Sequence, residues 1–268
     1  MRIVSWNVNG IRSIHRKGFL NWLRRDRPDV LGLQEMRATD EDLPAELRRL
    51  RAWTWYTCPA RRAGYSGTAV LSRHRPRRYA SSLGVPELDA EGRLQELDFG
   101  AMVLFNVYFP NGSGKGRDNS RVPFKLAFYR RLFDHIEQLR GQGREVVVMG
   151  DFNTAHREID LRNWRSNQTT SGFLPEERRE LDRWLQSGLI DTFRHVHGDV
   201  PGAYSWWSNR PGVRERNVGW RIDYVLITPG LLPHLRAAFI LQEVFGSDHC
   251  PVGIELDIEV DAASYPQR

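Results

Sequence analysis

Two kinds of hydrophobic pattern alternate along this chain, and they predict strands and helices. Apolar residues that alternate with polar ones or stand together, such as the VVVM before Gly150, are typical of buried strands. Apolar residues spaced three and four apart are typical of amphipathic helices. Strands are predicted at residues 2–8, 29–35, 65–73, 101–110, 144–153, 220–227 and 250–258. Helices are predicted at residues 19–25, 123–140 and 175–188.

The order of these elements favours a layered fold in one domain. Strands outnumber helices, and helices fall between only some of the strands, which fits an α/β sandwich better than a strict βαβ alternation. We predict two facing mixed β-sheets with helices outside them. No linker or repeat divides the chain, so we expect one domain over 1–268, with a core of about 1–258 and a short tail at 259–268. Two domains are the alternative that the length alone would suggest.

Composition narrows the partners and the compartment. The 268 residues carry a net charge of +6, which favours polyanions such as nucleic acid, anionic membranes or phosphorylated metabolites. The two cysteines, Cys58 and Cys250, give no disulfide framework, so we expect buried thiols in a reducing compartment. The first residues lack a signal-peptide pattern and no apolar run approaches ~20 residues, so we expect a cytoplasmic protein without a membrane partner.

Polar side chains stand where the predicted strands end or begin. They are Asn7, Glu35, Tyr108, Asp151, Asn153, Asp223, Asp248 and His249. Such positions can converge on one rim of a sandwich, although each residue alone has an ordinary interpretation as a turn or surface group. Asp223 lies inside an apolar strand, where a carboxylate needs a partner. His249 can supply it, so we predict that Asp223 keeps His249 protonated and facing a phosphate.

A series of segments from about Ile3 to Leu256 resembles, in order, the exonuclease III family of apurinic/apyrimidinic endonucleases. The segments are SWNVNGIR, LQEMRATDEDLP, YSGTAVLSR, NVYFPNG, VMGDFNTAHREIDL, SGFLPEERRELDRWL, LIDTFRH, NVGWRIDYVL and GSDHCPVGIEL. The resemblance implies a four-layer α/β sandwich. It also implies a DNA-repair nuclease that hydrolyses the phosphodiester 5′ to an abasic site in double-stranded DNA, with 3′–5′ exonuclease and 3′-end-trimming activity.

The resemblance also implies a role for each polar residue. Glu35 would be the metal ligand, and Asp248 would assist it directly or through water. Mg²⁺ prefers such oxygen ligands, and Mn²⁺ is expected to substitute for it. Asn7 would form hydrogen bonds near the metal and the phosphate. Asp151 would be the general base for the attacking water, and protonation of the leaving oxygen is the alternative that stays open.

Three further side chains would serve the phosphate and the water. Asn153 would fix the water or position Asp151, and Tyr108 would donate a hydrogen bond to a phosphoryl oxygen. His249, charged by its pairing with Asp223, would donate in the same way.

One more group of residues matches the family by position, and a basic loop is a further candidate on its composition alone. Trp206, Trp220 and Ile222 would form a pocket for the abasic sugar. Trp206 departs from the family, because many members carry Phe there, and the larger indole would tighten or reshape the pocket. The loop NGSGKGRDNSR would lie along the DNA backbone, where contacts add affinity without reading sequence. Its candidate contacts are Asn111, Lys115, Arg117 and Arg121, and a solvated loop is the alternative.

Two other functions compete with a nuclease. A non-catalytic DNA-binding relative would not need the complete set of polar residues. A phosphatase or phospholipase of the wider superfamily would not need a tryptophan pocket or a basic surface. We therefore expect a nuclease that acts on double-stranded DNA with abasic sites or damaged 3′ ends. We also expect the protein to be a monomer.

Overall fold

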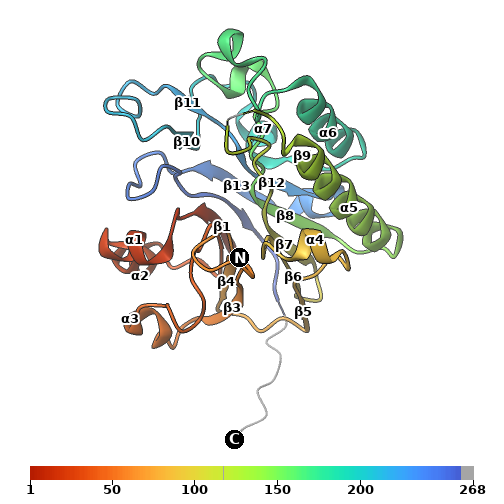
Figure 1. Ribbon diagram of the computed structural model, residues 1–268. Coiled ribbons are helices and arrows are strands. Elements are labelled where there is room, and N and C mark those ends of the chain that lie inside the picture. Colours follow the sequence, from red (N-terminus) through yellow and green to blue (C-terminus); the bar gives the residue numbers. More distant parts are fainter. Residues whose placement is uncertain (117, 261–268) are drawn as a thin grey trace, which may run out of the picture.

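Two six-stranded β-sheets face each other at the centre of the structure, and helices lie on their outer sides (Figure 1). The computed structural model describes residues 1–116 and 118–260. Arg117 and residues 261–268 of the expected tail lie outside the described residues.

The first sheet contains the N-terminal strand and has the order β13-β14-β1-β2-β4-β3. Its β1 and β2 run parallel, and the other neighbours run antiparallel, so the sheet is mixed. The strands are β1 (Arg2–Asn7), β2 (Val30–Gln34), β3 (Thr54–Cys58), β4 (Thr68–Ser72), β13 (Leu235–Ile240) and β14 (Val252–Leu256).

The second sheet has the order β5-β6-β7-β8-β12-β9, and only its β7–β8 pair is parallel among the described strands. Its strands are β5 (Arg78–Ala80), β6 (Leu94–Asp98), β7 (Val103–Tyr108), β8 (Val146–Asp151), β9 (Ile190–Asp191) and β12 (Asp223–Ile227). A separate short ribbon joins β10 (Trp206–Trp207) to β11 (Gly219–Trp220).

Helices cover the outer face of each sheet, as Figure 1 shows for α1 and α2 on one side and for α5 and α6 on the other. The α-helices are α1 (Ile11–Arg16), α2 (Phe19–Asp26), α3 (Ala45–Arg48), α4 (Pro86–Asp89), α5 (Val122–Gly141), α6 (Pro175–Gln186) and α7 (Thr192–His197). The short 3-10 turns are η1 (Glu158–Asp160), η2 (Trp164–Asn167) and η3 (Pro229–His234).

The apolar strands are buried on both faces because each supplies two cores. Successive side chains of a strand point to opposite faces of its sheet. In β1, Ile3 packs between the sheets, whereas Val4 packs against α1 and α2. In β7, Leu104 faces the space between the sheets and Phe105 faces α5. This arrangement confirms the predicted α/β sandwich and explains the near-continuous apolar runs.

Every long element predicted from the pattern is present, with ends that differ by a few residues. The pattern missed the short helices α1, α3, α4 and α7 and the strands β3, β5, β6, β9, β10 and β13. These strands are short, lie near sheet edges or carry charges; β6 contains a buried carboxylate, Glu96, that is paired with His135. The shared core between the sheets supports our proposal that the chain forms a single domain.

Two further expectations concern cysteines and membranes. Cys58 and Cys250 are both buried and free, as predicted for a chain without a disulfide framework. Among the described residues, no helix combines the length and the apolar character that crossing a bilayer requires.

A buried ionic network fixes the segment before β12. Arg221 is 1% exposed, and its Nε donates to Oδ1 of Asp160, which is 0% exposed, at 2.8 Å. Its Nη1 lies 2.8 Å from Oδ2 of Asp191. Burial opposes the charge of Arg221, but the two carboxylates outweigh burial and raise its pKa. The network therefore fixes the chain just before Asp223.

Arg221→Met should destabilise the fold strongly. The substitution leaves the buried carboxylate of Asp191 without a cation and Asp160 with Arg194 alone, and breaking a buried pair in this way costs about 3–5 kcal/mol of unfolding free energy. Urea denaturation measures the loss. Arg236→Met is the matched control, because Arg236 pairs with Asp257 at the surface and little change is expected there. A loss for Arg221→Met no larger than that of the control would contradict this account.

Candidate active site

The polar residues predicted from the strand ends lie together at one end of the two sheets. Parallel strands end at the same edge of a sheet, and β1 ends at Asn7 beside the end of β2, which Glu35 follows. In the second sheet, β8 ends at Asp151, opposite Asp223, where the antiparallel β12 begins. The turn that carries His249 enters β14 at this end. The fold therefore brings these chain segments to one rim.

A pocket of about 390 Å³ opens at this rim. Many of the residues that line it were singled out from the sequence: Glu35, Tyr108, Asn111, Asp151, Asn153, Trp206, Trp220, Ile222, Asp248 and His249. Asn7 and Asp223 are buried beneath it and reach it through hydrogen bonds to Asp151 and His249.

Asp151 is held by two asparagines. Asn7 Nδ2 donates to Oδ2 of Asp151 at 2.9 Å. The backbone N–H of Asn153 donates to Oδ1 at 2.8 Å, and its Nδ2 donates to Oδ2 at 3.3 Å. Asn153 has a φ of 49°, a left-handed conformation that asparagine tolerates better than most residues. This conformation lets one residue present two donors to the same carboxylate.

His249 is paired with Asp223, as the sequence predicted. Nδ1 of His249 lies 2.9 Å from Oδ2 of Asp223, and Ser205 Oγ donates to the same oxygen at 2.6 Å. The other ring nitrogen, Nε2, lies 3.8 Å from Oδ2 of Asp151. Burial opposes the charged ring, but the carboxylates of Asp223 and Asp151 outweigh burial and raise the pKa of His249 to about 10. The ring is therefore a cation at neutral pH.

The pKa of Asp151 is unusual for an aspartate, and burial is the main cause. Burial raises the pKa of Asp151 to about 7, although the positive His249 and the donor from Asn7 oppose the rise. A group whose pKa lies near the working pH can accept and release a proton efficiently. Tyr108 lies nearby, and burial followed by the charge of Glu35 raises its pKa well above the usual value. Its hydroxyl therefore remains a hydrogen-bond donor.

The apolar wall of the pocket comes from two tryptophans and an isoleucine. Trp206 and Trp220 pair across the β10–β11 ribbon with ring centroids 6.2 Å apart and an edge-to-face angle of 85°. Ile222 packs in the same cluster. Trp206 Nε1 also donates to Oδ2 of Asp248 at 3.2 Å, a bond that phenylalanine cannot make. Trp207, by contrast, is buried away from this pocket.

Two carboxylates of the pocket offer oxygen ligands for a metal. Glu35 Oε2 accepts from Asn7 Nδ2 at 3.2 Å, and Oε1 accepts from Arg37 Nε at 3.0 Å. Asp248 Oδ1 accepts from Asn9 Nδ2 at 2.8 Å. Burial opposes the charge of Asp248, but the positive His249 and hydrogen bonds from its neighbours keep its pKa below the usual value. Carboxylates with amide neighbours fit the oxygen preference of Mg²⁺.

A second group could also hold a metal. Ligand atoms of Asp151, Asp223 and His249 all lie within 4.8 Å of one another. However, Nδ1 of His249 is already bonded to Oδ2 of Asp223, so a metal here would have to break that bond. The chemistry of the donors therefore favours Glu35 and Asp248.

The sequence matches a family model of known proteins over this whole region. Residues 4–249 match the Endonuclease/Exonuclease/phosphatase family. The chain belongs to this family. An exodeoxyribonuclease from Bacillus subtilis is 40% identical over 259 residues, which cover 96% of this chain and 100% of that protein. A DNA-(apurinic or apyrimidinic site) endonuclease from Dictyostelium discoideum is 33% identical over 260 residues, covering 96% of this chain and 71% of that protein.

A solved structure agrees with these relatives. The 3′ phosphatase NExo from Neisseria, bound to a product DNA hairpin, superposes with a TM-score of 0.87 at 26% identity, covering 96% of this chain and 100% of that chain. Together the matches confirm the resemblance read from the motifs and the prediction of a hydrolytic nuclease.

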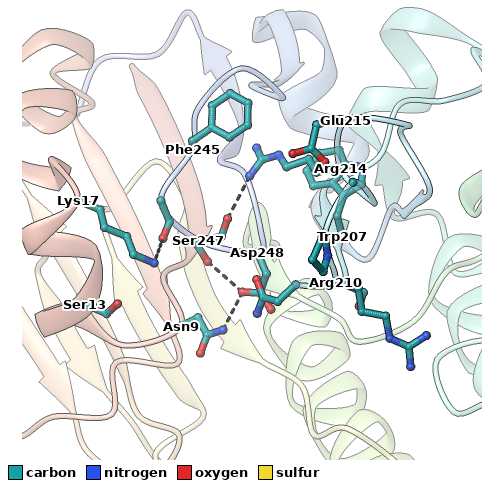
Figure 2. A pocket seen from close by; sticks show the side chains of 15 residues that line it. Asn9, Ser13, Lys17, Trp207, Arg210, Arg214, Glu215, Phe245, Ser247 and Asp248 are labelled. Carbon is teal, nitrogen blue, oxygen red and sulfur yellow. Dashed lines mark hydrogen bonds between the residues drawn. The ribbon is translucent and has the colours of Figure 1, made fainter.

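Basic pockets flank the site of this family member on two sides. Beyond Tyr108 lies a pocket of about 520 Å³, where Lys115 and Arg121 stand with Arg61, Arg62 and Arg93. On the side of Asp248 lies a pocket of about 490 Å³ that contains Lys17, Arg210 and Arg214 (Figure 2). Arg121 also donates to both carboxylate oxygens of Glu91 at 2.9 Å, so part of its charge is used within the protein. Arg117 cannot be placed, because it is outside the described residues.

Several residues at the site were missed by the sequence analysis. Asn9 lines the pocket and bonds to Asp248, as Figure 2 shows, and Arg37 bonds to Glu35. Both lie in quoted motifs, SWNVNGIR and LQEMRATDEDLP, so the motifs carried a signal. Ser171 and Gly172 also line the pocket, and they open the quoted motif SGFLPEERRELDRWL, although the hydrophobic pattern alone does not distinguish them from an ordinary loop.

The rate of hydrolysis should depend on pH with two limbs. Asp151 must be ionised to accept a proton, so the rate should rise until the pH passes about 7. His249 must be charged to donate, so the rate should fall as the pH passes about 10. Single-turnover rates measured across this range test both limbs. A flat profile on the acidic side would contradict the state assigned to Asp151.

The raised pKa values of Asp151 and His249 also make the free energy of unfolding depend on pH. Both pKa values are raised in the folded state, so each group stabilises the fold most at low pH. For Asp151, the contribution is complete below the ordinary value of 3.8 and is lost as the pH rises through about 7. For His249, it is complete below 6.5 and is lost as the pH rises through about 10.

Proposed function

We propose that this chain is a DNA-repair nuclease that uses Mg²⁺ to hydrolyse the phosphodiester 5′ to an abasic site in double-stranded DNA. Exonuclease action from the 3′ end and trimming of damaged 3′ ends would use the same site. One observation supports the proposal most: a buried carboxylate with a pKa near neutrality lies beside a paired imidazolium, under a tryptophan-walled pocket.

Asp151 accepts the proton of the attacking water in this mechanism. Asn7 and Asn153 hold its carboxylate by three hydrogen bonds, which favour the ionised form and fix its direction. The alternative role for Asp151, protonation of the leaving oxygen, would use the same raised pKa.

His249 and Tyr108 donate to the phosphoryl oxygens. The charged Nε2–H of His249 is a stronger donor than a neutral ring would be. Tyr108, which also lines the pocket, adds a neutral donor. A divalent metal held by Glu35 and Asp248 would supply charge stabilisation for the phosphoryl and leaving oxygens.

The pocket wall supports selection of an abasic sugar. A nucleotide without a base costs least to flip out of a duplex, because its pairing is already lost. Trp206, Trp220 and Ile222 would enclose the bare sugar, and the hydrogen bond from Trp206 to Asp248 links this wall to the metal ligands. The basic pockets on both sides would hold the flanking phosphates. The cytoplasmic localisation and the monomeric state stay predictions.

Glu35→Gln should shift the Mg²⁺ dependence of the reaction. Loss of a ligand carboxylate should raise the Mg²⁺ concentration for half-maximal rate by at least about 10–100-fold, the range seen even for outer-sphere partners of a metal. A metal titration of the single-turnover rate measures this, and circular dichroism checks that the fold persists. Glu41→Gln, an exposed carboxylate, is the control. An unchanged titration would show that Glu35 is not a ligand.

A panel of substrates tests the proposed function itself. It contains a duplex with one abasic analogue, an intact duplex with a recessed 3′ end, a duplex with a 3′-phosphate, an inositol phosphate and sphingomyelin. The proposal expects turnover of the DNA substrates, with the abasic duplex cut internally. Turnover of the inositol phosphate or sphingomyelin in place of DNA would show that the chain is a phosphatase or phospholipase. Binding of abasic DNA without cleavage would show a non-catalytic relative.

A further inference from the structure

A completely buried ion pair lies behind the pocket. Lys125 on α5 and Glu177 on α6 are both 0% exposed, and Nζ of Lys125 lies 2.7 Å from Oε1 of Glu177. Taking two charges out of water costs several kcal/mol for each ion, and an apolar pair of similar size is often as stable. The stability of the fold alone therefore does not explain why this pair is buried, and its other contacts suggest a reason.

Lys125 holds the backbone of Asn153. Its Nζ donates to the carbonyl oxygen of Asn153 at 2.6 Å. Asn153 is the residue whose left-handed backbone lets both of its N–H groups reach Asp151. A shift of this carbonyl would disturb the left-handed backbone conformation of Asn153, which directs its N–H groups to the Asp151 carboxylate.

Glu177 holds the neighbouring segment of the pocket lining. Its Oε1 accepts from Ser171 Oγ at 2.8 Å, and its Oε2 accepts from the N–H of Gly172 at 2.5 Å and that of Leu174 at 3.1 Å. The bond to Leu174 also caps the start of α6. Gly172 is packed so closely that a Cβ added to it would lie 3.2 Å from the Trp220 ring and 3.2 Å from the Asn153 carbonyl oxygen. The carboxylate therefore fixes the segment that faces Trp220.

A third segment, which contains Asn111 and Gly112, packs against the same ion pair. A Cβ added to Gly112 would lie 2.4 Å from Ser171 Oγ and 3.1 Å from Oε1 of Glu177. The preceding residue, Asn111, donates from Nδ2 to Oδ1 of Asn153 at 3.2 Å. Three segments that line the pocket thus meet at one buried ion pair, although the two charged residues are 52 positions apart.

We propose that Lys125 and Glu177 form a positioning pair, which sets the donors to Asp151 and the pocket wall beside Trp220 relative to each other. The inference rests on the proposed function, because it assigns Asp151 and Trp220 to one reaction. Capping of α6 needs only the carboxylate, whereas the bond to Asn153 needs the lysine. The pair touches no substrate and acts through Asn153 and Gly172.

The double variant Lys125→Met/Glu177→Gln tests this role. It removes both charges together, so no buried ion is left unpaired and the melting temperature should stay close to that of the wild type. The amide can still accept a hydrogen bond from α6, but the bond to the Asn153 carbonyl is lost. A misplacement of about 1 Å can cost about 100-fold in rate, so we expect kcat for an abasic duplex to fall about 10–100-fold. KM and the Kd for an uncleaved duplex should stay within about twofold, because the basic pockets are untouched.

The chain offers a matched control pair. Arg144 donates to Asp98 through Nη2 at 2.6 Å at the end of β6, and neither residue lines the active-site pocket. Arg144→Met/Asp98→Asn neutralises an ion pair in the same way. Its kcat should equal that of the wild type, which separates a local effect on the pocket from a general effect of removing charges.

The outcomes are distinct. A folded double variant whose kcat stays within about twofold of the wild type overturns the inference, since that is far below the loss expected from misplacement. If the double variant does not fold, Lys125→Gln/Glu177→Gln decides in the same way, because it also leaves no buried ion unpaired and keeps two side chains that can bond to each other: a lowered kcat with unchanged Kd supports the inference, and an unchanged kcat overturns it. A wild-type chain that cleaves no abasic duplex refutes the proposed function and the inference with it. An active wild type with an equally active variant refutes the inference alone.

Discussion

Asp151→Asn should reduce kcat for abasic DNA by about 10³-fold, within the range that general-base catalysis contributes. The asparagine amide has nearly the same shape, so the fold and the pocket should persist. It cannot accept a proton from water, however, and its nitrogen would face the donor from Asn7. Binding of uncleaved abasic DNA should be retained, because the tryptophan wall and the basic pockets do not involve Asp151 chemistry.

Single-turnover cleavage and a separate binding titration measure these two properties. Asp257→Asn, a surface carboxylate paired with Arg236, is the matched control and should cleave like the wild type. If Asp151→Asn cleaves within tenfold of the wild type, the assignment fails, because a tenfold change is only about 1.4 kcal/mol of barrier.

Thermal unfolding gives an independent check. The loss of stability that the wild type shows as the pH rises through about 7 should be weaker in the variant.

His249→Asn should remove most of the activity, about 10³-fold, because a charged donor to the phosphoryl oxygen is lost. Asp223→Asn should lower the pKa of His249 from about 10 and move the high-pH limb of the rate profile downward. The reason is geometric: Oδ2 of Asp223 lies 2.9 Å from Nδ1 of His249. In the double variant the Asp223 change should be nearly silent, since groups that act as a unit are not additive.

A titration of the histidine ring by NMR tests the pairing without activity. The His249 signal should titrate at lower pH in Asp223→Asn than in the wild type. His135, whose Nε2 lies 2.6 Å from Oε2 of Glu96 on the outer face of the second sheet, serves as the internal control, because it does not contact Asp223. An unmoved His249 titration, or fully additive losses in the double variant, would show that the two residues do not act together.

The candidate site was largely predictable because buried strands leave few explanations for polar residues. Asp223 stands in an apolar strand, and burial alone disfavours a carboxylate there, so a partner had to be expected. The residues at the ends of β1, β2 and β8 lie at one rim, once the two sheets and their strand directions are recognised. The pairing of Asp223 with His249 followed from the same reasoning and is found in the structure.

Other features could not be found from the sequence, for physical reasons. Lys125 lies on an amphipathic helix, and the pattern does not show that its side chain reaches the carbonyl of Asn153 or that Glu177 meets it from another helix. Asn9 follows a strand and has the appearance of a turn residue, whereas its contact to Asp248 joins residues 239 positions apart. The strand β6 carries Glu96, which is buried and pairs with His135 from α5 and with Arg78 from β5. Each of these features depends on a partner distant in the chain.

The most direct test uses one duplex with a single internal abasic analogue, incubated with the wild-type chain in Mg²⁺ and in EDTA and resolved on a denaturing gel. The account predicts one cut on the 5′ side of the analogue in Mg²⁺, leaving a 3′-hydroxyl and a 5′-deoxyribose phosphate. In EDTA the cut should be absent, and it should return when Mg²⁺ is restored. An uncut duplex in Mg²⁺, or equal cutting in EDTA, would contradict the account.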